Sequence, residues 1–211
     1  MTPEMILFII LNLLRADNAN NLDNQEVHNH LVEVSQAIST HATDSVPAER
    51  LISLAYNESR FGYRYVLKGT YPKSSWGACG IYQQVTKFSK IKTTCKKLGT
   101  DVDHATKVAV AYLEYMIDRW DIKGVSKMDS RMCHYYSGNS CDDNKDKVLN
   151  LDDEAMRYAN RHKKARLKAL KYKTKYRGKS KRARKVVTLK SLFSVLKKNK
   201  EVTKESLFAG L

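Results

Sequence analysis

Glu58 is the residue of this sequence whose type and surroundings best suit acid–base chemistry. It lies near the end of an apolar stretch, with Leu54, Ala55 and Phe61 as neighbours. A carboxyl group in such surroundings is partly desolvated, which disfavours its charged form. A general acid that works near neutral pH needs to hold its proton in this way. A single Glu at a helix end is more often an ordinary solvated residue, so the assignment depends on the motifs around it.

Three short motifs contain or follow this carboxyl group in a fixed order. The first is Tyr56-Asn57-Glu58-Ser59-Arg60-Phe61. The second and third are Gly77-Ala78-Cys79-Gly80-Ile81-Tyr82-Gln83-Gln84 and Tyr135-Tyr136-Ser137-Gly138. Each motif alone is a weak signal, whereas their order and spacing together are specific.

The three motifs together resemble the catalytic domain of soluble lytic transglycosylases, lysozyme-like enzymes that cut the glycan strands of peptidoglycan. The resemblance covers roughly residues 45–165 and includes Arg157-Tyr158-Ala159, which is similar to the last core helix of that family. It implies a mainly α, lysozyme-like fold with a short irregular β or loop region in the cleft.

The resemblance also assigns residues to the site. It implies that Glu58 is the single catalytic acid. Two positions depart from the family pattern, since Tyr136 stands where Asn is usual and Tyr82 where Met is common. Small residues would let a sugar approach the backbone, and polar ones would bind its hydroxyl or N-acetyl groups. The implied substrate-binding residues are Ser59, Gly77, Ala78, Gly80, Tyr82, Gln83, Tyr135 and Tyr136.

Glycosidases generally use two carboxylates, whereas the family that this sequence resembles uses one. The acid protonates the glycosidic oxygen of the MurNAc–GlcNAc β-1,4 bond, and the resulting base takes the proton of the muramic 6-hydroxyl, giving a 1,6-anhydro product. No Asp or Glu lies between Phe61 and Asp101, which favours this route. Asp101 and Asp103 are better explained as helix-start residues. The alternative is hydrolysis of the same bond, as in goose-type lysozymes, and neither route is expected to need a metal or other cofactor.

Helical periodicity dominates the middle of the chain. It predicts helices over residues 31–41, 47–62, 101–120 and 128–136 and from residue 152 onward. The composition of residues 63–89 predicts a loop with a short hairpin. Aromatic side chains in this loop either stack on sugar rings or join the loop to the core; they are Tyr63, Tyr65, Tyr71, Trp76 and Tyr82.

The N-terminal segment, residues 1–21, contains a short apolar run from Met5 to Leu14. The run is too short to span a bilayer, which takes about 20 residues. Its length and the small residues Ala16 and Ala19 fit an export signal or a membrane contact, although Glu4 precedes it and no Lys or Arg does. The alternative is a helix packed on the domain.

Four cysteines, Cys79, Cys95, Cys133 and Cys141, lack the close pairs typical of structural zinc sites. An even number agrees with two disulfides in an exported protein, for which three pairings are possible. Reduced, buried thiols are the alternative.

Net charge is distributed unevenly along the chain of 211 residues. Its overall value is +16, yet residues 1–160 contain 19 Lys and Arg against 20 Asp and Glu, while residues 161–211 contain 19 against 2. The acid-free run over 173–185 is expected to be unstructured by itself, and Leu189, Leu192, Phe193 and Leu196 predict a short basic amphipathic helix. The expected organisation is an N-terminal segment (1–21), a leading helix (22–44), a catalytic domain (45–172) and a basic tail (173–211).

The basic tail suggests a partner that carries negative charge, namely a membrane, a cell-wall polymer or DNA. A second hypothesis is therefore a virion protein that binds nucleic acid or membrane and uses a lysozyme-like domain as its scaffold. Under the enzymatic hypothesis, the protein is bacteriolytic and acts at the bacterial cell wall. It would then be a secreted or periplasmic enzyme or part of a phage virion.

Overall fold

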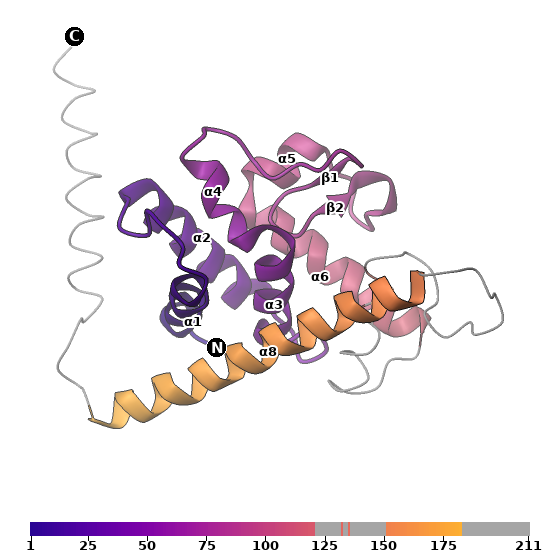
Figure 1. Cartoon of the computed structure of the whole chain (residues 1–211). Coiled ribbons are helices and arrows are strands. Elements are labelled where there is room, and N and C mark those ends of the chain that lie inside the picture. Colours follow the sequence, from indigo (N-terminus) through magenta and orange to yellow (C-terminus); the bar gives the residue numbers. More distant parts are fainter. Residues whose placement is uncertain (121–131, 133–134, 136–150, 183–211) are drawn as a thin grey trace, which may run out of the picture. The chain divides into compact units, whose positions relative to one another are not determined.

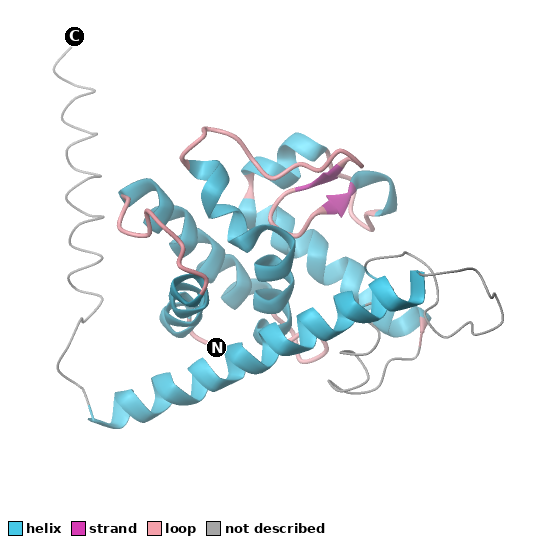
Figure 2. Cartoon of the chain, viewed as in Figure 1, coloured by secondary structure: helices cyan, strands magenta, loops and turns pink. Residues whose placement is uncertain are grey.

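The computed structural model describes residues 1–120, 132, 135 and 151–182, with side chains over 157–177 in the last range. Within these residues the protein is mainly helical, which confirms the expected mainly α class (Figures 1 and 2). The chain divides into two compact units, Met1–Thr174 and Lys175–Leu211. The contacts described below all belong to the first unit.

Helix α1, Pro3–Ala16, contributes to the hydrophobic core. Thr2 caps it by accepting a hydrogen bond from the Met5 amide. The helix packs against α2, Gln25–His41. In the structure, this segment is therefore a helix packed on the domain, and export stays a prediction. Across the described part of the chain, no helix has the length and hydropathy needed to cross a membrane. The buried side chains of α1 are Ile6, Leu7, Ile9, Ile10, Leu13 and Leu14.

Helix α3, Ala48–Ser59, is the most buried of the described helices, and it presents Glu58 in its last turn. It begins directly after Pro47, as its sequence predicts. Its residues from Ala48 to Tyr56 are all buried except Glu49. Helices α1 and α2 both pack against it. Glu58 is therefore mounted on an element whose position the core determines.

The segment after α3 is a loop with short elements, and a short hairpin is present as predicted. A 3-10 turn, Arg60–Gly62, and a one-turn helix α4, Tyr63–Val66, follow α3 directly. Strands β1, Ala78–Cys79, and β2, Gln84–Val85, then pair antiparallel, with Ala78 opposite Val85. A second 3-10 turn, Thr86–Phe88, follows them.

Helices α5, Cys95–Thr100, and α6, Val102–Arg119, pack on this hairpin and on α2 respectively. Asp101 caps α6, because its Oδ1 accepts a hydrogen bond of 2.8 Å from the His104 amide. The prediction of a helix start at this position is thus confirmed. The buried apolar residues of α6 include Ala105, Val108, Ala109, Leu113 and Met116.

Helix α8, Leu151–Arg182, is the longest described element. Its start near Asp152 is as predicted, but the expectation of an unstructured run from Lys173 is wrong for residues 173–182. Lys and Arg have high helix propensity, and positive charge near a helix C-terminus is favourable. The other predicted helices, over 128–136 and 189–196, lie outside the described residues, apart from Met132 and Tyr135, which are both helical.

Candidate functional site

Helices α3 and α8 together hold the carboxyl group of Glu58. The Tyr158 hydroxyl donates a hydrogen bond to Oε1 of Glu58, and His162 Nε2 lies 3.7 Å from the same oxygen. The Glu58 side chain is 16% exposed, whereas that of His162 is completely buried. Burial, with the charge of Glu58 as the second cause, raises the pKa of Tyr158 well above its ordinary value. Tyr158 therefore keeps its proton as a donor, and Glu58 is a partly desolvated acid that solvent can still reach.

The backbone turns sharply directly after Glu58 and Ser59. Arg60, Phe61 and Gly62 are all in the left-handed region, with φ of 53°, 61° and 73°. Such a conformation is unfavourable for Arg and Phe and persists only where surrounding contacts impose it. The strained turn thus needs external anchors.

Two helices supply those anchors. Arg60 Nε forms an ion pair of 2.8 Å with Asp17, which follows α1, and its guanidinium lies over the Tyr56 ring. Burial and a hydrogen bond to Asp17 raise the pKa of Tyr56 to about 12. His30 Nε2, on α2, donates a hydrogen bond of 2.7 Å to the Phe61 carbonyl. The end of α3 that contains Glu58 is consequently fixed by α1 and α2.

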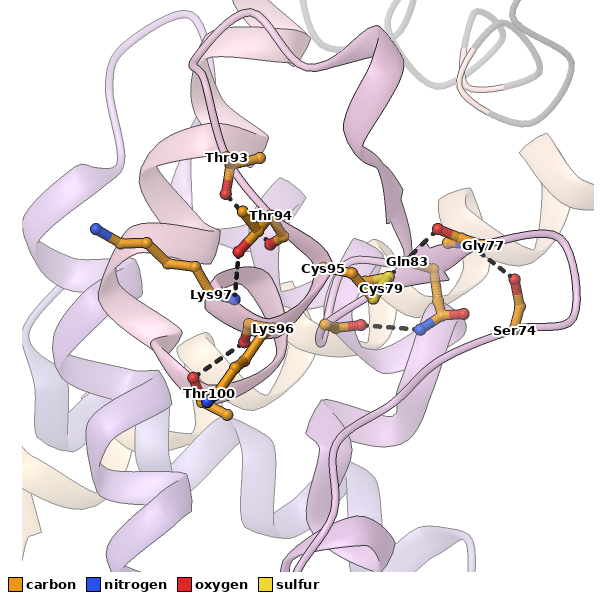
Figure 3. Close-up of a disulfide and its surroundings, with 12 residues drawn as sticks. Ser74, Gly77, Cys79, Gln83, Thr93, Thr94, Cys95, Lys96, Lys97 and Thr100 are labelled. Carbon is orange, nitrogen blue, oxygen red and sulfur yellow. Dashed lines mark hydrogen bonds between the residues drawn. A yellow bond between two sulfur atoms is a disulfide. The ribbon is translucent and has the colours of Figure 1, made fainter.

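The hairpin loop is attached to α3 and to α5. Ser59 Oγ donates a hydrogen bond of 2.8 Å to the Ile81 carbonyl. A disulfide joins Cys79 to Cys95 (Figure 3), which is one of the pairs left open by the sequence; Cys133 and Cys141 lie outside the described residues. The loop is thus joined both to α3, which presents Glu58, and to α5.

Gly80 shows why a small residue is needed in this loop. Its φ is +74°, and a Cβ built there would lie 2.2 Å from the Leu98 carbonyl oxygen of α5. Gly77 also has a positive φ, +79°, but space is open around its missing Cβ. The absence of a side chain at Gly80 therefore permits close contact with α5, which accounts for a glycine at this position; the approach of a sugar to the loop stays a prediction.

A small open pocket, with a cavity volume of about 60 Å³, lies beside the hairpin. Gln83 turns its side chain back, with Nε2 donating to the Gly80 carbonyl at 2.9 Å. Tyr135 donates a hydrogen bond of 2.8 Å to the Tyr82 carbonyl and meets the ring of Tyr112 edge-on. The residues that line the pocket are Gln83, Gln84, Val85, Phe88, Ser89, Tyr112 and Tyr135.

Tyr135 connects this pocket electrostatically with Glu58. Burial, with the charge of Glu58 as the second cause, raises the pKa of Tyr135 well above its ordinary value. The hydroxyl of Tyr135 is therefore within the electrostatic reach of the Glu58 carboxyl group. Two of the residues expected to bind substrate, Gln83 and Tyr135, line one pocket. Glu58 is not among the residues that line it, and the described link between them is the effect of its charge on Tyr135.

The expected substrate contact of Tyr82 is corrected by the structure. Its side chain is fully buried, and its hydroxyl lies 3.2 Å from Thr106 Oγ1 on α6. An aromatic ring at this point of the loop fills the core between the hairpin and α6, so no sugar can reach it. Ala78 is half-buried in β1, where its amide donates to Ser74 Oγ, and Tyr136 lies outside the described residues.

The loop aromatics divide between the core and the surface. Tyr63 is 5% exposed and belongs to the core, as does Tyr82, whereas Trp76 is 90% exposed. Tyr71 packs against Gly99 of α5, and Tyr65 is half-buried. Of the five aromatics that the sequence offered for sugar stacking, Trp76 alone projects freely into solvent.

Other carboxyl groups near the start of α6 have separate functions. Asp101 caps α6, and Asp103 lies 2.8 Å from His41 Nε2. Both line a groove with Glu33 and Thr40 that is distinct from the pocket of Gln83 and Tyr135. Over the residues that the structure describes, no group of three or more His, Cys, Asp or Glu side chains could hold a metal ion.

The sequence reasoning missed the direct contacts of Glu58 on α8. Tyr158 entered it only as part of a helix resembling the last core helix of the transglycosylases, and His162 did not enter it at all. Both residues lie on one face of α8, four positions apart, and that spacing was the available signal.

Among known proteins, no family model, no curated protein and no solved structure matches this chain.

Proposed function

We propose that this protein cleaves the MurNAc–GlcNAc β-1,4 bond of peptidoglycan by non-hydrolytic transglycosylation, on a lysozyme-like domain. The observation that carries the proposal is the environment of Glu58. Its carboxyl group is 16% exposed, accepts a hydrogen bond from Tyr158, and acts electrostatically on Tyr135 in the pocket wall. A general acid requires both partial desolvation and access to the substrate.

Glu58 would act twice in this reaction. As a carboxylic acid it gives its proton to the glycosidic oxygen, so that the bond from C1 of MurNAc to this oxygen breaks, GlcNAc leaves with a free hydroxyl, and the muramic sugar acquires oxocarbenium character. As a carboxylate it then accepts the proton of the muramic 6-hydroxyl, whose oxygen closes the 1,6-anhydro ring. Gln83 and Tyr135 are the described residues of the expected set that line the pocket where a sugar would bind.

Hydrolysis by a goose-type-like muramidase is the competing reaction at the same bond. It requires activation of a water molecule, commonly by a second carboxylate. Asp101 and Asp103 are engaged at the start of α6 and line a different groove. This arrangement supports the route that uses one carboxylate.

The test is digestion of purified peptidoglycan by the full chain in ¹⁸O-labelled water. The products are then analysed by mass spectrometry. We expect products that end in 1,6-anhydro-MurNAc and contain no label. Glu58→Gln should reduce the rate by about 10²–10⁴-fold, since it retains the shape of the side chain but not its transferable proton. The matched controls, Asp101→Asn and Asp103→Asn, should retain activity. Labelled reducing ends would instead establish hydrolysis, and a folded but inactive Asp variant would contradict the one-carboxylate route.

A second function, binding to an anionic polymer or surface, is favoured by the exposed face of α8. No Asp or Glu occurs between Glu154 and Glu201. Phospholipid headgroups, wall polymers and nucleic acids all offer the complementary charge. Such binding would suit an enzyme that acts at the cell wall, either secreted or periplasmic or in a phage virion. The exposed basic residues of this face up to Thr174 are Arg157, Arg161, Lys163, Lys164, Lys168 and Lys171.

Truncation after Thr174 tests whether residues 175–211 add to this anionic binding. A chain ending at Thr174 retains Lys173, which lies 3.7 Å from Glu49, and lacks the second compact unit. We expect it to cleave peptidoglycan at the full-length rate, to melt at nearly the same temperature, and to bind anionic vesicles and DNA more weakly. Full-length binding should decrease steeply with salt. Equal binding by both chains would show that residues 175–211 do not contribute.

A further inference from the structure

His162 is a fully buried histidine beside the carboxyl group of Glu58. Its side chain is 0% exposed, and its Nε2 lies 3.7 Å from Oε1 of Glu58. The ring packs on that of Tyr158, one turn earlier on α8, with 4.3 Å between the ring centroids. Because no solvent reaches His162, it cannot touch a sugar in the pocket, and any effect on the reaction must act through Glu58.

The surroundings of His162 favour its neutral form. Burial lowers its pKa, the positive charges of Arg50 on α3 and Arg161 on α8 act in the same direction, and Glu58 opposes them. Among the described residues, His162 Nδ1 has no hydrogen-bond partner. An imidazolium would place a second N–H there without an acceptor, which is costly in a buried site. A neutral ring with its proton on Nε2 avoids this cost and directs that N–H toward Glu58.

Both contacts of the Glu58 carboxyl group on α8 involve the same oxygen. The Tyr158 hydroxyl donates to Oε1, and His162 Nε2 approaches Oε1 as well. A separation of 3.7 Å exceeds a hydrogen bond, but such contacts often shorten when the substrate binds. Two donors on one oxygen would fix the plane of the carboxyl group, and none of the contacts described for Glu58 involves its other oxygen, Oε2.

We propose that neutral His162 is a positioning residue for Glu58: its Nε2–H and the Tyr158 hydroxyl hold Oε1, and Oε2 is the oxygen that exchanges the proton with the sugar. This inference rests on the proposed function of Glu58 as the acid. It assigns the two oxygens of that carboxyl group different tasks. It also gives α8 a direct influence on the geometry of proton transfer.

The kinetic test compares His162→Gln with His162→Leu in the full chain. Gln keeps an N–H donor but does not titrate, whereas Leu fills the space without a donor. We expect His162→Gln to retain kcat within about threefold, and His162→Leu to lose about tenfold to 10²-fold in kcat with little change in KM, the scale expected for a misplaced reacting group. His104→Gln, at a histidine bonded to Thr93 instead, is the matched control and should retain both constants. Equal kcat in the Leu and Gln variants would overturn the proposal.

A second measurement does not depend on activity or on the folding of the Leu variant. Nitrogen-15 NMR of His162 in the unaltered chain should show a neutral ring protonated at Nε2 at pH 7. In Glu58→Gln its pKa should be lowered further, because the carboxylate that favours the imidazolium is gone. An Nδ1-protonated or charged ring at pH 7, or a pKa unaffected by Glu58→Gln, would refute the coupling. If the chain proves inactive on peptidoglycan, the proposed function fails, while this titration still tests the contact between His162 and Glu58.

Discussion

The Tyr158 hydroxyl donates its hydrogen bond to Glu58 across 100 residues of sequence. Tyr158 lies on α8 and Glu58 at the end of α3, so the acid obtains its donor only when the last described helix packs on the central one. A contact between residues so far apart in the sequence closes a long loop, which has an entropic cost. The environment of Glu58 is therefore a property of the assembled domain and not of the short motif that contains it.

Removing this donor should impair both stability and activity. Tyr158→Phe keeps the ring against His162 but loses the hydroxyl, which costs about 1.5–3 kcal/mol when the bond is to a charged group. We expect a folded protein with kcat reduced about tenfold or more, measured as release of soluble muropeptides. Tyr115→Phe, whose hydroxyl contacts Arg119 on α6, is the control. A Tyr158→Phe protein as active as the control would remove Tyr158 from the site.

Two glycines of the hairpin loop form a matched pair. Gly80→Ala should be strongly destabilising, because its Cβ would lie 2.2 Å from the Leu98 backbone oxygen. Gly77→Ala meets open space and should incur only the cost of its left-handed backbone, about 1–2 kcal/mol. Urea unfolding of both variants measures the difference. Equal losses of the free energy of unfolding in the two variants would show that α5 does not confine Gly80.

The disulfide should stabilise the loop by closing it. Cys79 and Cys95 are 16 residues apart, and closing a loop of about that length is worth about 3 kcal/mol in the chain-entropy account. We expect Cys79→Ala with Cys95→Ala to lower the free energy of unfolding by up to that amount, as measured in urea. Treatment of the unaltered protein with a reductant should give a similar loss. A variant as stable as the parent chain would mean that the other contacts between β1 and α5 hold the loop without the disulfide.

Substitutions at two neighbouring residues test whether α1 belongs to the hydrophobic core. Ile10 is 0% exposed, whereas the adjacent Leu11 is only partly buried. Ile10→Ala should cost about 2–5 kcal/mol, the usual range for a buried aliphatic side chain, and Leu11→Ala clearly less. Thermal melts of the full chain provide the comparison. A small and equal effect of both changes would indicate that α1 does not belong to the core in solution.

Stability should decrease in mild acid because buried histidines must charge. Burial lowers the pKa of His30 from its ordinary value of 6.5, so between these two values the unfolded chain binds more protons than the folded one. The free energy of unfolding is then fully retained above about pH 6.5 and falls as the pH drops toward the folded pKa. His30→Gln should reduce this slope, by at most about 1.4 kcal/mol per pH unit, in urea titrations at pH 7.5 and 5.5. An unaltered slope would exclude His30 as its source.

Local patterns in the sequence predicted much of the fold but only part of the site. Periodicity and capping residues located α3 and α6, because a helix with one apolar face has a clear signature. The apolar run of α1 did not distinguish a core helix from an export signal, since both need a similar length of apolar residues. Burial of Tyr82 and the contact of His162 with Glu58 depend on how distant helices pack. The four-residue spacing of Tyr158 and His162 places them on one face of a helix, but it does not tell which distant residue that face contacts.

The strained turn at Arg60 and Phe61 determines where a functional fragment of this protein can begin. Resemblance to an enzyme family places the catalytic region at about residues 45–172, yet the turn after Glu58 is held by Asp17, which follows α1, and by His30 on α2. A recombinant piece that starts at residue 45 would contain every motif and lack both anchors. The smallest fragment that keeps the turn after Glu58 intact must therefore include the two N-terminal helices, because Asp17 and His30 hold that turn.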